Sequence, residues 1–240
     1  MMGYSHSVSA AAAWLALNEA GVLGIDDPAT LAVTTLTAAG AGMLPDLDHP
    51  QGTIANSIPP VSRWLARLVA HISGGHRKGT HSLLGLAVFW ALTYFADRLT
   101  YAGLPVAAIG LAAFSGGLAL RVFQAPGGWL GAILVGLGAM TTGALPLLPW
   151  AVLAGAAVHL LGDFLTTRGI NLFWPLTFKP LVASRFWRKS GYMALPILGD
   201  AGSGREGLLT SALTLYLACY LLAFVGILPL FPAQFFASLI

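Results

Sequence analysis

Long apolar segments separated by short polar stretches limit most strongly what this chain can fold into. Four of them, residues 83–96, 104–120, 129–148 and 207–228, are typical of membrane-crossing helices, which need about 20 apolar residues, or somewhat fewer where neighbours cover the ends. Only 9% of the residues are charged and 57% are hydrophobic, whereas soluble proteins carry roughly 25% charged residues. The sequence therefore predicts an all-α bundle embedded in lipid.

Three further segments extend this bundle. Residues 151–165 follow a break at Pro146 and Pro149, where proline ends one helix and begins the next. Residues 8–23 and 31–44 are shorter and rich in Ala, Thr and Gly, which is typical of helices packed inside a membrane bundle. We therefore expect one integral membrane domain over residues 1–240, a polytopic bundle of about five to seven membrane helices.

The basic residues fall almost entirely on one side if the chain starts inside and crosses at each of these segments. Loops 45–82 and 166–206 and the turn at Arg121 then share that side with eleven of the twelve Lys and Arg residues, and only Arg98 lies opposite. Cytoplasmic loops retain Lys and Arg during insertion. The pattern predicts a multi-pass membrane protein with a cytoplasmic N-terminus. The net charge of +3 is explained by this topology, so we expect no nucleic-acid partner.

The longer of the two loops, residues 166–206, combines aromatic and basic residues, as in Phe186-Trp187-Arg188-Lys189. Such a mixture suits the lipid headgroup zone, although an ordinary cytoplasmic loop would also show it. Membrane lipids are therefore the expected partners. The single cysteine, Cys219, excludes a disulfide within the chain and any multi-cysteine metal motif.

The first polar cluster is the stretch from Pro45 to Pro50, which holds Asp46, Asp48 and His49. The two prolines prevent a helix from continuing, so the loop can point its carboxylates and imidazole at a common centre. Helix capping is the alternative, but a cap needs one carboxylate only. The cluster predicts metal ligands, and a carboxylate that could take up a proton.

The second cluster lies just before an apolar helix and contains His76, Arg77, Lys78 and His81. Gly75 and Gly79 permit a tight turn that brings the two imidazoles together. The adjacent positive charges of Arg77 and Lys78 suit an anionic substrate such as a phosphate. A solvated basic loop beside the membrane is the alternative.

The third cluster is His159 and Asp163, which share one face of a helix because they are four residues apart. A buried hydrogen-bonded pair would show the same spacing, but ionisable residues in a membrane helix are costly and usually functional. The predicted crossings bring all three clusters and His6 to the cytoplasmic face. His71 belongs to no cluster, and we expect it to be a bystander.

Imidazole and carboxylate without thiolate suit zinc or manganese, and magnesium is possible. The number of candidate ligands exceeds the need of one ion, so two divalent ions are expected. The expected metal ligands are His6, Asp46, Asp48, His49, His76, His81, His159 and Asp163.

These motifs also resemble a known family. Leu-Pro-Asp-Leu-Asp-His-Pro at 44–50, His-Arg-Lys-Gly-Thr-His-Ser at 76–82 and His-Leu-Leu-Gly-Asp-Phe-Leu-Thr at 159–166, followed by Gly-Ile-Asn-Leu-Phe-Trp-Pro at 169–175, resemble the YdjM-like family of LexA-regulated inner-membrane, metal-dependent hydrolases. The resemblance extends from His6 to Pro175. It departs at Lys78 and Gly79, where the family usually has a small or aromatic pair. The His-x-x-x-Asp element is also distantly similar to zinc-dependent phospholipase C and P1-type nucleases.

The resemblance implies a hydrolase, and the residues suggest how it would work. We expect metal-activated water to cleave a phosphoester of a phospholipid or lipid-linked phosphate, with Asp46, Asp48 and Arg77 as catalytic residues. Arg77 and Lys78 would hold the phosphate. A metal-ion transporter or sensor and a protein with a purely structural metal site are the alternatives. The substrate and the oligomeric state do not follow from the sequence.

Overall fold

The computed structural model describes residues 1–125, 128–225 and 227, and this part of the chain is helical without a named strand. The prediction of an all-α fold is therefore confirmed. Its α-helices are α1 (Gly3–Glu19), α2 (Pro28–Ala41), α3 (Val61–Ile72), α4 (Leu83–Ala96), α5 (Val106–Val122), α6 (Gly128–Thr141), α7 (Leu148–Phe164) and α8 (Gly204–Phe224). Short 3-10 helices lie between them: η1 (Leu44–Asp48), η2 (Ile54–Asn56), η3 (Gly79–His81) and η4 (Leu145–Leu147).

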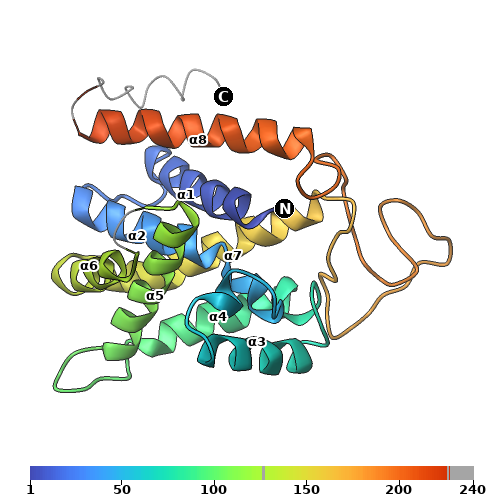
Figure 1. Ribbon diagram of the computed structural model, residues 1–240, viewed down its shortest axis with the longest axis horizontal. Coiled ribbons are helices and arrows are strands. Elements are labelled where there is room, and N and C mark those ends of the chain that lie inside the picture. The colour runs from blue at the N-terminus through green and yellow to red at the C-terminus, as the bar shows by residue number, and fades with distance from the viewer. Residues whose placement is uncertain (126–127, 226, 228–240) are drawn as a thin grey trace.

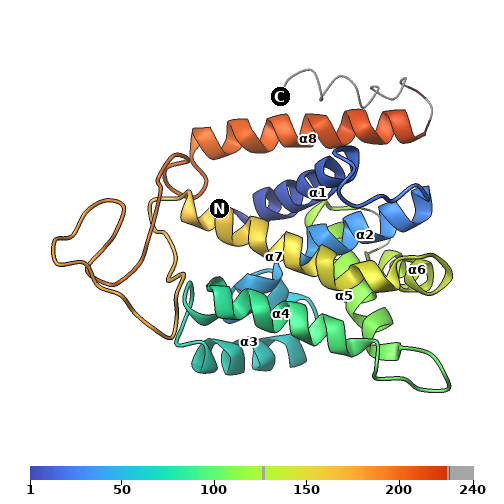
Figure 2. The same ribbon diagram turned by 180° about the vertical axis from the view of Figure 1, so that it is seen from behind.

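Helices α1, α2 and α7 form the centre of the bundle and pack against one another. Helix α8 lies along α1 at one edge, whereas α3 and α4 form the opposite edge (Figures 1 and 2). The segment between α7 and α8 projects from the end of the bundle at which α7 finishes and α8 begins (Figure 1). The largest buried side chains include Trp14, Met43, Leu118 and Leu148, so the core extends through the middle of the bundle.

Helix starts follow the capping chemistry of the sequence. The Asp27 carboxylate accepts a hydrogen bond from the Thr30 amide at 2.8 Å, and Pro28 occupies the first position of α2. Ser82 caps α4 through the Gly85 amide at 3.1 Å. Ser203 caps α8 through the Glu206 amide at 3.3 Å. These caps fix where α4 and α8 begin, and both starts lie at the end of the bundle that carries the polar clusters.

Two features of the structure differ from the expected segments. The predicted span 129–148 is wrong, because α6 ends at Thr141 and a turn containing Gly143 separates it from η4. Gly143 lies beyond the end of α6, and its amide donates to the Thr30 hydroxyl at 3.2 Å. The loop 45–82 is not irregular throughout, because it contains α3. The apolar segments did not reveal α3, because it has only 12 residues and alternates polar with apolar side chains.

Two helical stretches of the described residues are long and apolar enough to cross a membrane: Leu145–Phe164 and Gly204–Phe224. The helices α4, α5 and α6 are apolar but shorter. Large hydrophobic side chains are exposed on several of these helices, for example Leu92, Leu134 and Leu208. The structure thus has helices suited to a membrane, while five to seven crossings stay a prediction.

Glycines allow the central helices to approach closely. A Cβ added to Gly40 of α2 would lie 1.7 Å from the Ser115 carbonyl oxygen of α5, and one added to Gly155 of α7 would lie 2.2 Å from the Ala38 carbonyl oxygen. Both neighbours are backbone atoms, which cannot move aside without shifting a helix. Close contact between small residues is the usual basis of helix association in lipid.

We expect Gly40→Ala to destabilise the protein, because the new methyl group would push α2 away from α5. Overpacking of this kind costs about 1–3 kcal/mol, which a thermal melt of the purified protein in detergent would detect as a lower Tm. Gly110→Ala on α5 is the matched control, since a Cβ there meets no atom within 4 Å. Equal melting temperatures for the two variants would contradict this account of the packing.

Candidate metal centre

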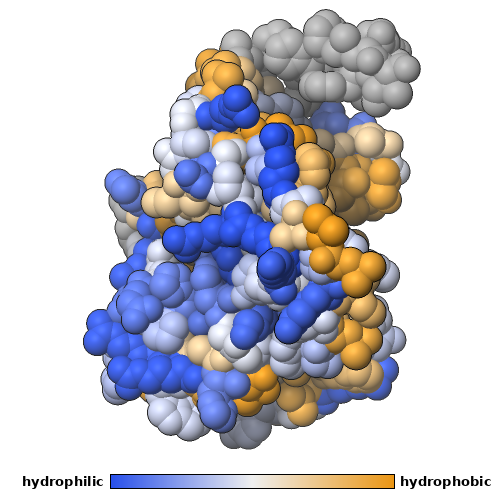
Figure 3. Space-filling view, turned by 90° about the vertical axis from the view of Figure 1, so that its right-hand side faces the viewer, coloured by the Kyte–Doolittle hydropathy of each residue, from blue (hydrophilic) through white to orange (hydrophobic). Residues whose placement is uncertain are grey.

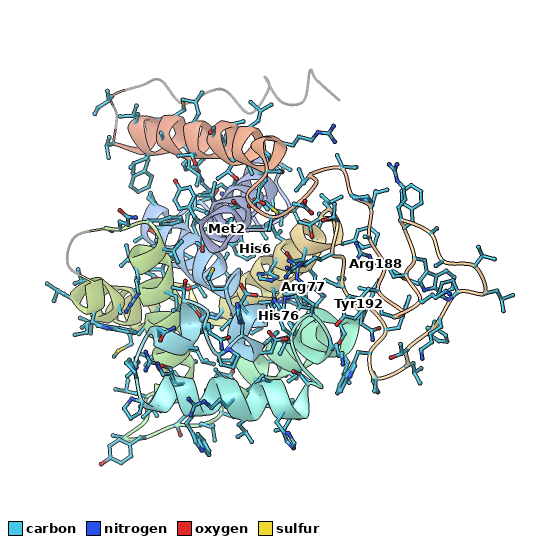
Figure 4. All side chains as sticks on the ribbon, turned by 45° about the vertical axis from the view of Figure 1, so that its right-hand side comes forward. Met2, His6, His76, Arg77, Arg188 and Tyr192 are labelled. Atoms are coloured by element: carbon cyan, nitrogen blue, oxygen red, sulfur yellow. The ribbon has the colours of Figure 1, made fainter. Side chains whose placement is uncertain are left out.

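Four separate segments supply the polar side chains at one end of the bundle. His6 comes from the second turn of α1, and Asp46 and Asp48 come from η1 directly after α2. The turn before α4 supplies His76 and His81, and the last turns of α7 supply His159 and Asp163. Figure 4 shows His6, His76 and Arg77 gathered in this region.

Two imidazoles and two carboxylates form the centre of this cluster. The Nε2 atoms of His81 and His159 lie 3.1 Å apart. Asp46 Oδ1 lies 3.6 Å from His81 Nε2 and 3.7 Å from His159 Nε2. Asp163 Oδ2 lies 3.5 Å and 3.9 Å from the same two nitrogens. Ligand atoms on a tetrahedral zinc ion with bonds of about 2.0–2.1 Å are separated by about 3.3 Å. Each carboxylate oxygen therefore lies near ligand spacing from the two nitrogens.

Hydrogen bonds on the far side of each ring fix which nitrogen faces the centre. His159 Nδ1 lies 2.6 Å from the Gly42 carbonyl oxygen, to which it can only donate. Its Nε2 lone pair is then free to bind a metal. His81 Nδ1 lies 3.0 Å from the Thr80 hydroxyl and 3.4 Å from Asp48 Oδ2. Both rings are thus oriented by outer partners, as metal-ligating histidines usually are.

Asp163 uses its other oxygen to join three segments of the chain. Arg77 Nη2 donates to Oδ1 at 2.9 Å, and the amino group of Met1 forms an ion pair with the same oxygen. His6 Nε2 lies 3.4 Å from it, and the His6 ring stacks on the His159 ring with centroids 3.6 Å apart. This carboxylate is 2% exposed, so its charge depends on these partners.

A second group lies on the other side of His81. Asp48 Oδ1 is 2.7 Å from His76 Nδ1, and Asp48 Oδ2 accepts from the Thr80 hydroxyl at 2.6 Å and from the Arg77 amide at 3.2 Å. Arg77 takes a positive φ of 63°, which turns the chain so that its amide and its guanidinium both point inward. Gly75 also has a positive φ, of 104°. The predicted tight turn is confirmed, with the rings of His76 and His81 5.1 Å apart.

The pKa values outside the candidate spans reflect this crowding of charge. Burial alone would lower the pKa of His81, but hydrogen bonds and charge interactions with Asp46 and Asp48 raise it to about 9. Burial would raise the pKa of Asp48, but its bonds to His76 and His81 lower it to about 2. Burial would also raise the pKa of Asp46, but its contacts with His159 and His81 hold it below its usual range. Without a metal, a proton on His81 therefore offsets part of the negative charge of Asp46 and Asp48.

The cluster fits a divalent metal ion in its donor chemistry. Two Nε2 atoms that face each other at 3.1 Å repel unless a proton or a cation lies between them. His6 Nδ1 is buried and has no hydrogen-bond partner in the described part of the chain. Two groups have ligand atoms close enough to hold an ion: Asp46, Asp48, His76 and His81 in one, and His6, His159 and Asp163 in the other. The contact between His81 and His159 connects the two groups.

The structure brings together most of the residues that the sequence singled out. Of the eight expected ligands, only His49 lies outside both groups; its ring is 4.8 Å from that of His76. His71 is exposed on α3, as expected of a bystander. Lys78 is half-buried beside the turn. Arg77 is buried, and its guanidinium donates to Thr166 and Gly169 as well as to Asp163.

Sequence reasoning missed several groups that complete the site. Thr80 lies inside the second motif, and its hydroxyl could have been suspected as a partner of a carboxylate. Nothing in the sequence pointed to the Gly42 carbonyl or to Tyr192, whose hydroxyl donates to the His76 carbonyl at 3.3 Å. Burial raises the pKa of Tyr192, and the nearby charge of Asp48 raises it further. Tyr192 therefore stays a neutral hydrogen-bond donor at the edge of the cluster.

Access to the cluster is best from the side of Asp46 and His76. Their side chains are 18% and 31% exposed, whereas those of His81, His159 and Asp163 are 0–2% exposed. Tyr192 and Arg188 belong to the projecting segment between α7 and α8 (Figure 4). Figure 3 looks at this end of the molecule and shows hydrophilic residues over much of it, with hydrophobic residues along one edge.

The fold and the site define a class: a helical protein with membrane-suited helices and a buried imidazole–carboxylate cluster able to hold a metal ion. The model of one family, described as YdjM inner membrane protein, matches residues 1–229. The chain belongs to this family, so it is an inner-membrane protein, and the resemblance of its motifs is confirmed. The match also includes the C-terminal third, which the motifs did not cover. No curated protein and no solved structure matches the chain.

We predict that metal affinity rises with pH. A metal can bind His81 Nε2 only after the imidazolium proton leaves, and the raised pKa of about 9 keeps that proton bound at neutral pH. Affinity should increase about tenfold per pH unit below pH 9 for one displaced proton, and level off above it. Competition titrations with Zn²⁺ or Mn²⁺ against a chelator at several pH values measure this slope. An affinity that stays constant over about two pH units around neutrality would contradict it.

We also predict a graded loss of metal among ligand variants. His159→Ala should remove bound metal, because both carboxylates then face a single imidazole. Asp48→Asn should weaken affinity about 10–100-fold, as expected for a partner that orients a ligand. Metal content by elemental analysis and affinity by calorimetry test both. His71→Ala is the control, and a metal content equal to wild type in His159→Ala would refute the assignment.

Proposed function

We propose that this protein is a membrane-bound, metal-dependent hydrolase that cleaves a phosphoester of a phospholipid or lipid-linked phosphate. The arrangement of Asp46, His81, His159 and Asp163 supports this most directly: ligand atoms from separate segments approach one another to 3.1–3.9 Å. A second carboxylate–imidazole pair, Asp48 and His76, lies beside them. Groups of this kind, with one side accessible, are typical of hydrolytic metal sites.

In this proposal, Asp46, His81, His159 and Asp163 hold one divalent ion, zinc or manganese, with magnesium as a further possibility. Candidate ligands for a second ion lie on two sides of this set: His6 next to Asp163, and Asp48 with His76 beyond His81. When bound, such ions lower the pKa of water and stabilise negative charge on a phosphoryl oxygen. The surrounding side chains then have to orient the ligands, move a proton and bind the substrate.

Asp46 is the best candidate to accept the proton. It is the most exposed carboxylate of the cluster, at 18%, and only its Oδ1 faces the two histidines. Its carboxylate is ionised at neutral pH, so it has a lone pair that can take up a proton. Asp48, by contrast, is 0% exposed and already accepts from several donors. We therefore assign Asp48 to the orientation of His81 and His76.

Arg77 and Lys78 contribute to phosphate binding in different ways in this proposal. The guanidinium of Arg77 holds Asp163 in place at 2.9 Å, and its positive charge also favours an anion in the cluster. Its Nε is buried without a hydrogen-bond partner among the described residues. Lys78 lies at the rim and can reach a phosphate as a flexible point charge.

The multi-pass topology with a cytoplasmic site belongs to the same proposal. The distribution of basic residues supports it, since eleven of twelve fall on one side of the predicted crossings. The hydrophilic end in Figure 3 is the end that carries the cluster, which agrees with a site at the membrane surface. A substrate with a lipid anchor and a polar phosphate would meet the site there.

A purely structural metal site is the second candidate. The near-complete burial of His81, His159 and Asp163 favours it, because structural sites are closed by protein ligands. The partial exposure of Asp46 and His76 favours the hydrolase instead. A metal-ion transporter or sensor would need ligands along a path through the membrane, whereas these lie at helix ends.

The decisive experiment is a phosphate-release assay with purified protein in phospholipid micelles and with a soluble phosphoester. We expect metal-dependent turnover that falls to the chelated background in His81→Ala and Asp163→Ala. His71→Ala should retain full activity. Activity that survives chelation, or that is equal in the ligand variants, would reject the proposal. A tightly bound metal without turnover on any phosphoester would favour the structural site.

A further inference from the structure

Helix α3 carries a row of large apolar side chains that the described part of the bundle leaves exposed. At 3.6 residues per turn, five of them fall on one face of the helix. Each is 39–66% exposed, and together they form the apolar row of α3: Val61, Trp64, Leu65, Leu68 and Ile72. Figures 1 and 2 show α3 at the outer edge of the bundle. An exposed apolar face of this kind marks a surface that contacts lipid or another molecule.

A different face of α3 attaches the helix to the bundle. Ser62 and Ala66 are buried, and the helix packs against η1 and η2. The Ser62 hydroxyl donates to the Ala55 carbonyl at 2.7 Å, which ties the start of α3 to η2. The apolar row is therefore not needed to hold α3 in place, and it is available for contact with a partner.

The two arginines of α3 lie on the side away from the apolar row. Arg63 and Arg67 are four residues apart, and with Gln51 and Asn56 they line a hollow of about 320 Å³. Asn56 Oδ1 accepts from Arg63 Nε at 2.9 Å and so orients that guanidinium. Among the described residues, Arg77 is the only arginine in an ion pair, so both guanidinium groups of the hollow are without a carboxylate partner there. They suit a phosphate, which arginine binds through paired hydrogen bonds.

A lipid surface fits this combination better than a second protein. Helix α3 has 12 residues, so its row is about 18 Å long at 1.5 Å per residue and about 10 Å wide. The row thus offers about 180 Å², whereas a stable protein interface buries about 800 Å² on each partner. An inner-membrane protein needs no such minimum area to keep one helix on a lipid surface. Apolar residues with a tryptophan on one face and basic residues on the other are typical of helices in the headgroup layer.

We propose that α3 is an interfacial helix that binds anionic phospholipid at the membrane surface. Its apolar row lies among the lipid chains, and the hollow with Arg63 and Arg67 takes up a headgroup phosphate. Such helices insert by about 5–10 Å, so the far side of a helix about 10 Å wide stays at the level of the headgroups. Because α3 packs on η1, this lipid contact also fixes the depth of the segment that carries Asp46 and Asp48. This role of α3 does not require hydrolase activity.

Spin labels on the full-length protein test the lipid contact. With the single cysteine removed by Cys219→Ser, Ile72→Cys places a label on the apolar row, and Ala70→Cys places the matched control on the opposite side of α3. The vesicles consist of equal parts of phosphatidylcholine and phosphatidylglycerol. We expect the label at residue 72 to collide with oxygen, which concentrates in lipid, and to be shielded from a water-soluble nickel chelate. The label at residue 70 should be more accessible to the chelate.

Two results of this experiment would overturn the lipid contact. One is equal accessibility of the two labels to the nickel chelate, which would leave the apolar row in water. The other is spin–spin broadening at residue 72, because it would show that a second copy of the chain covers the row.

A lipid titration tests the hollow. In neutral detergent, we expect Arg63→Gln/Arg67→Gln to bind short-chain phosphatidylglycerol about 25-fold more weakly than wild type, about fivefold for each basic residue. Calorimetry measures this loss, and affinity for phosphatidylcholine of the same chain length should not change. Both arginines are exposed, so the Tm should stay at the wild-type value. Arg98→Gln is the control, since Arg98 lies beyond α4 and does not line the hollow. Equal phosphatidylglycerol affinity in the double variant and wild type would reject the headgroup site.

Discussion

The buried carboxylate of Asp163 is the group on which the polar interior depends. A charge in an apolar bundle is costly unless it is paired and hydrogen-bonded. Asp163 meets this need with Arg77 and the Met1 amino group on one oxygen, and with His81 and His159 near the other. Because these partners come from three parts of the chain, satisfying one carboxylate holds the start of α1, the turn before α4 and the end of α7 together.

The backbone packing makes this convergence possible. Gly155 lets α7 approach the end of α2, from which η1 begins, and Gly162 leaves room for the Met1 side chain beside Asp163. Larger residues at these positions would separate α7 from α1 and α2. The small residues that pack the helices therefore also set the distances between the metal-ligand candidates. Structure and proposed chemistry depend on the same close contacts.

Much of the candidate site could be predicted from the sequence, because its residues lie in short motifs with few other ionisable groups nearby. The turn with His76 and His81, and the i, i+4 pair of His159 and Asp163, are local features that spacing alone reveals. The different surroundings of Asp46 and Asp48, by contrast, do not follow from the local sequence. Both stand in one motif, yet one is partly exposed and faces two imidazoles, and the other is enclosed by Thr80, His76 and the Arg77 amide.

The sequence by itself determined the helical class, the membrane setting and the identities of the metal-ligand candidates. Apolar length, scarce charge and the spacing of His and Asp are properties of the chain that need no partner. Only the tertiary structure decided that Asp163 lies near two imidazoles, that α3 lies within the predicted loop 45–82, and that Arg77 and the Met1 amino group pair with the same carboxylate. Each of these results from contacts between residues far apart in the chain, and such contacts depend on how the helices pack.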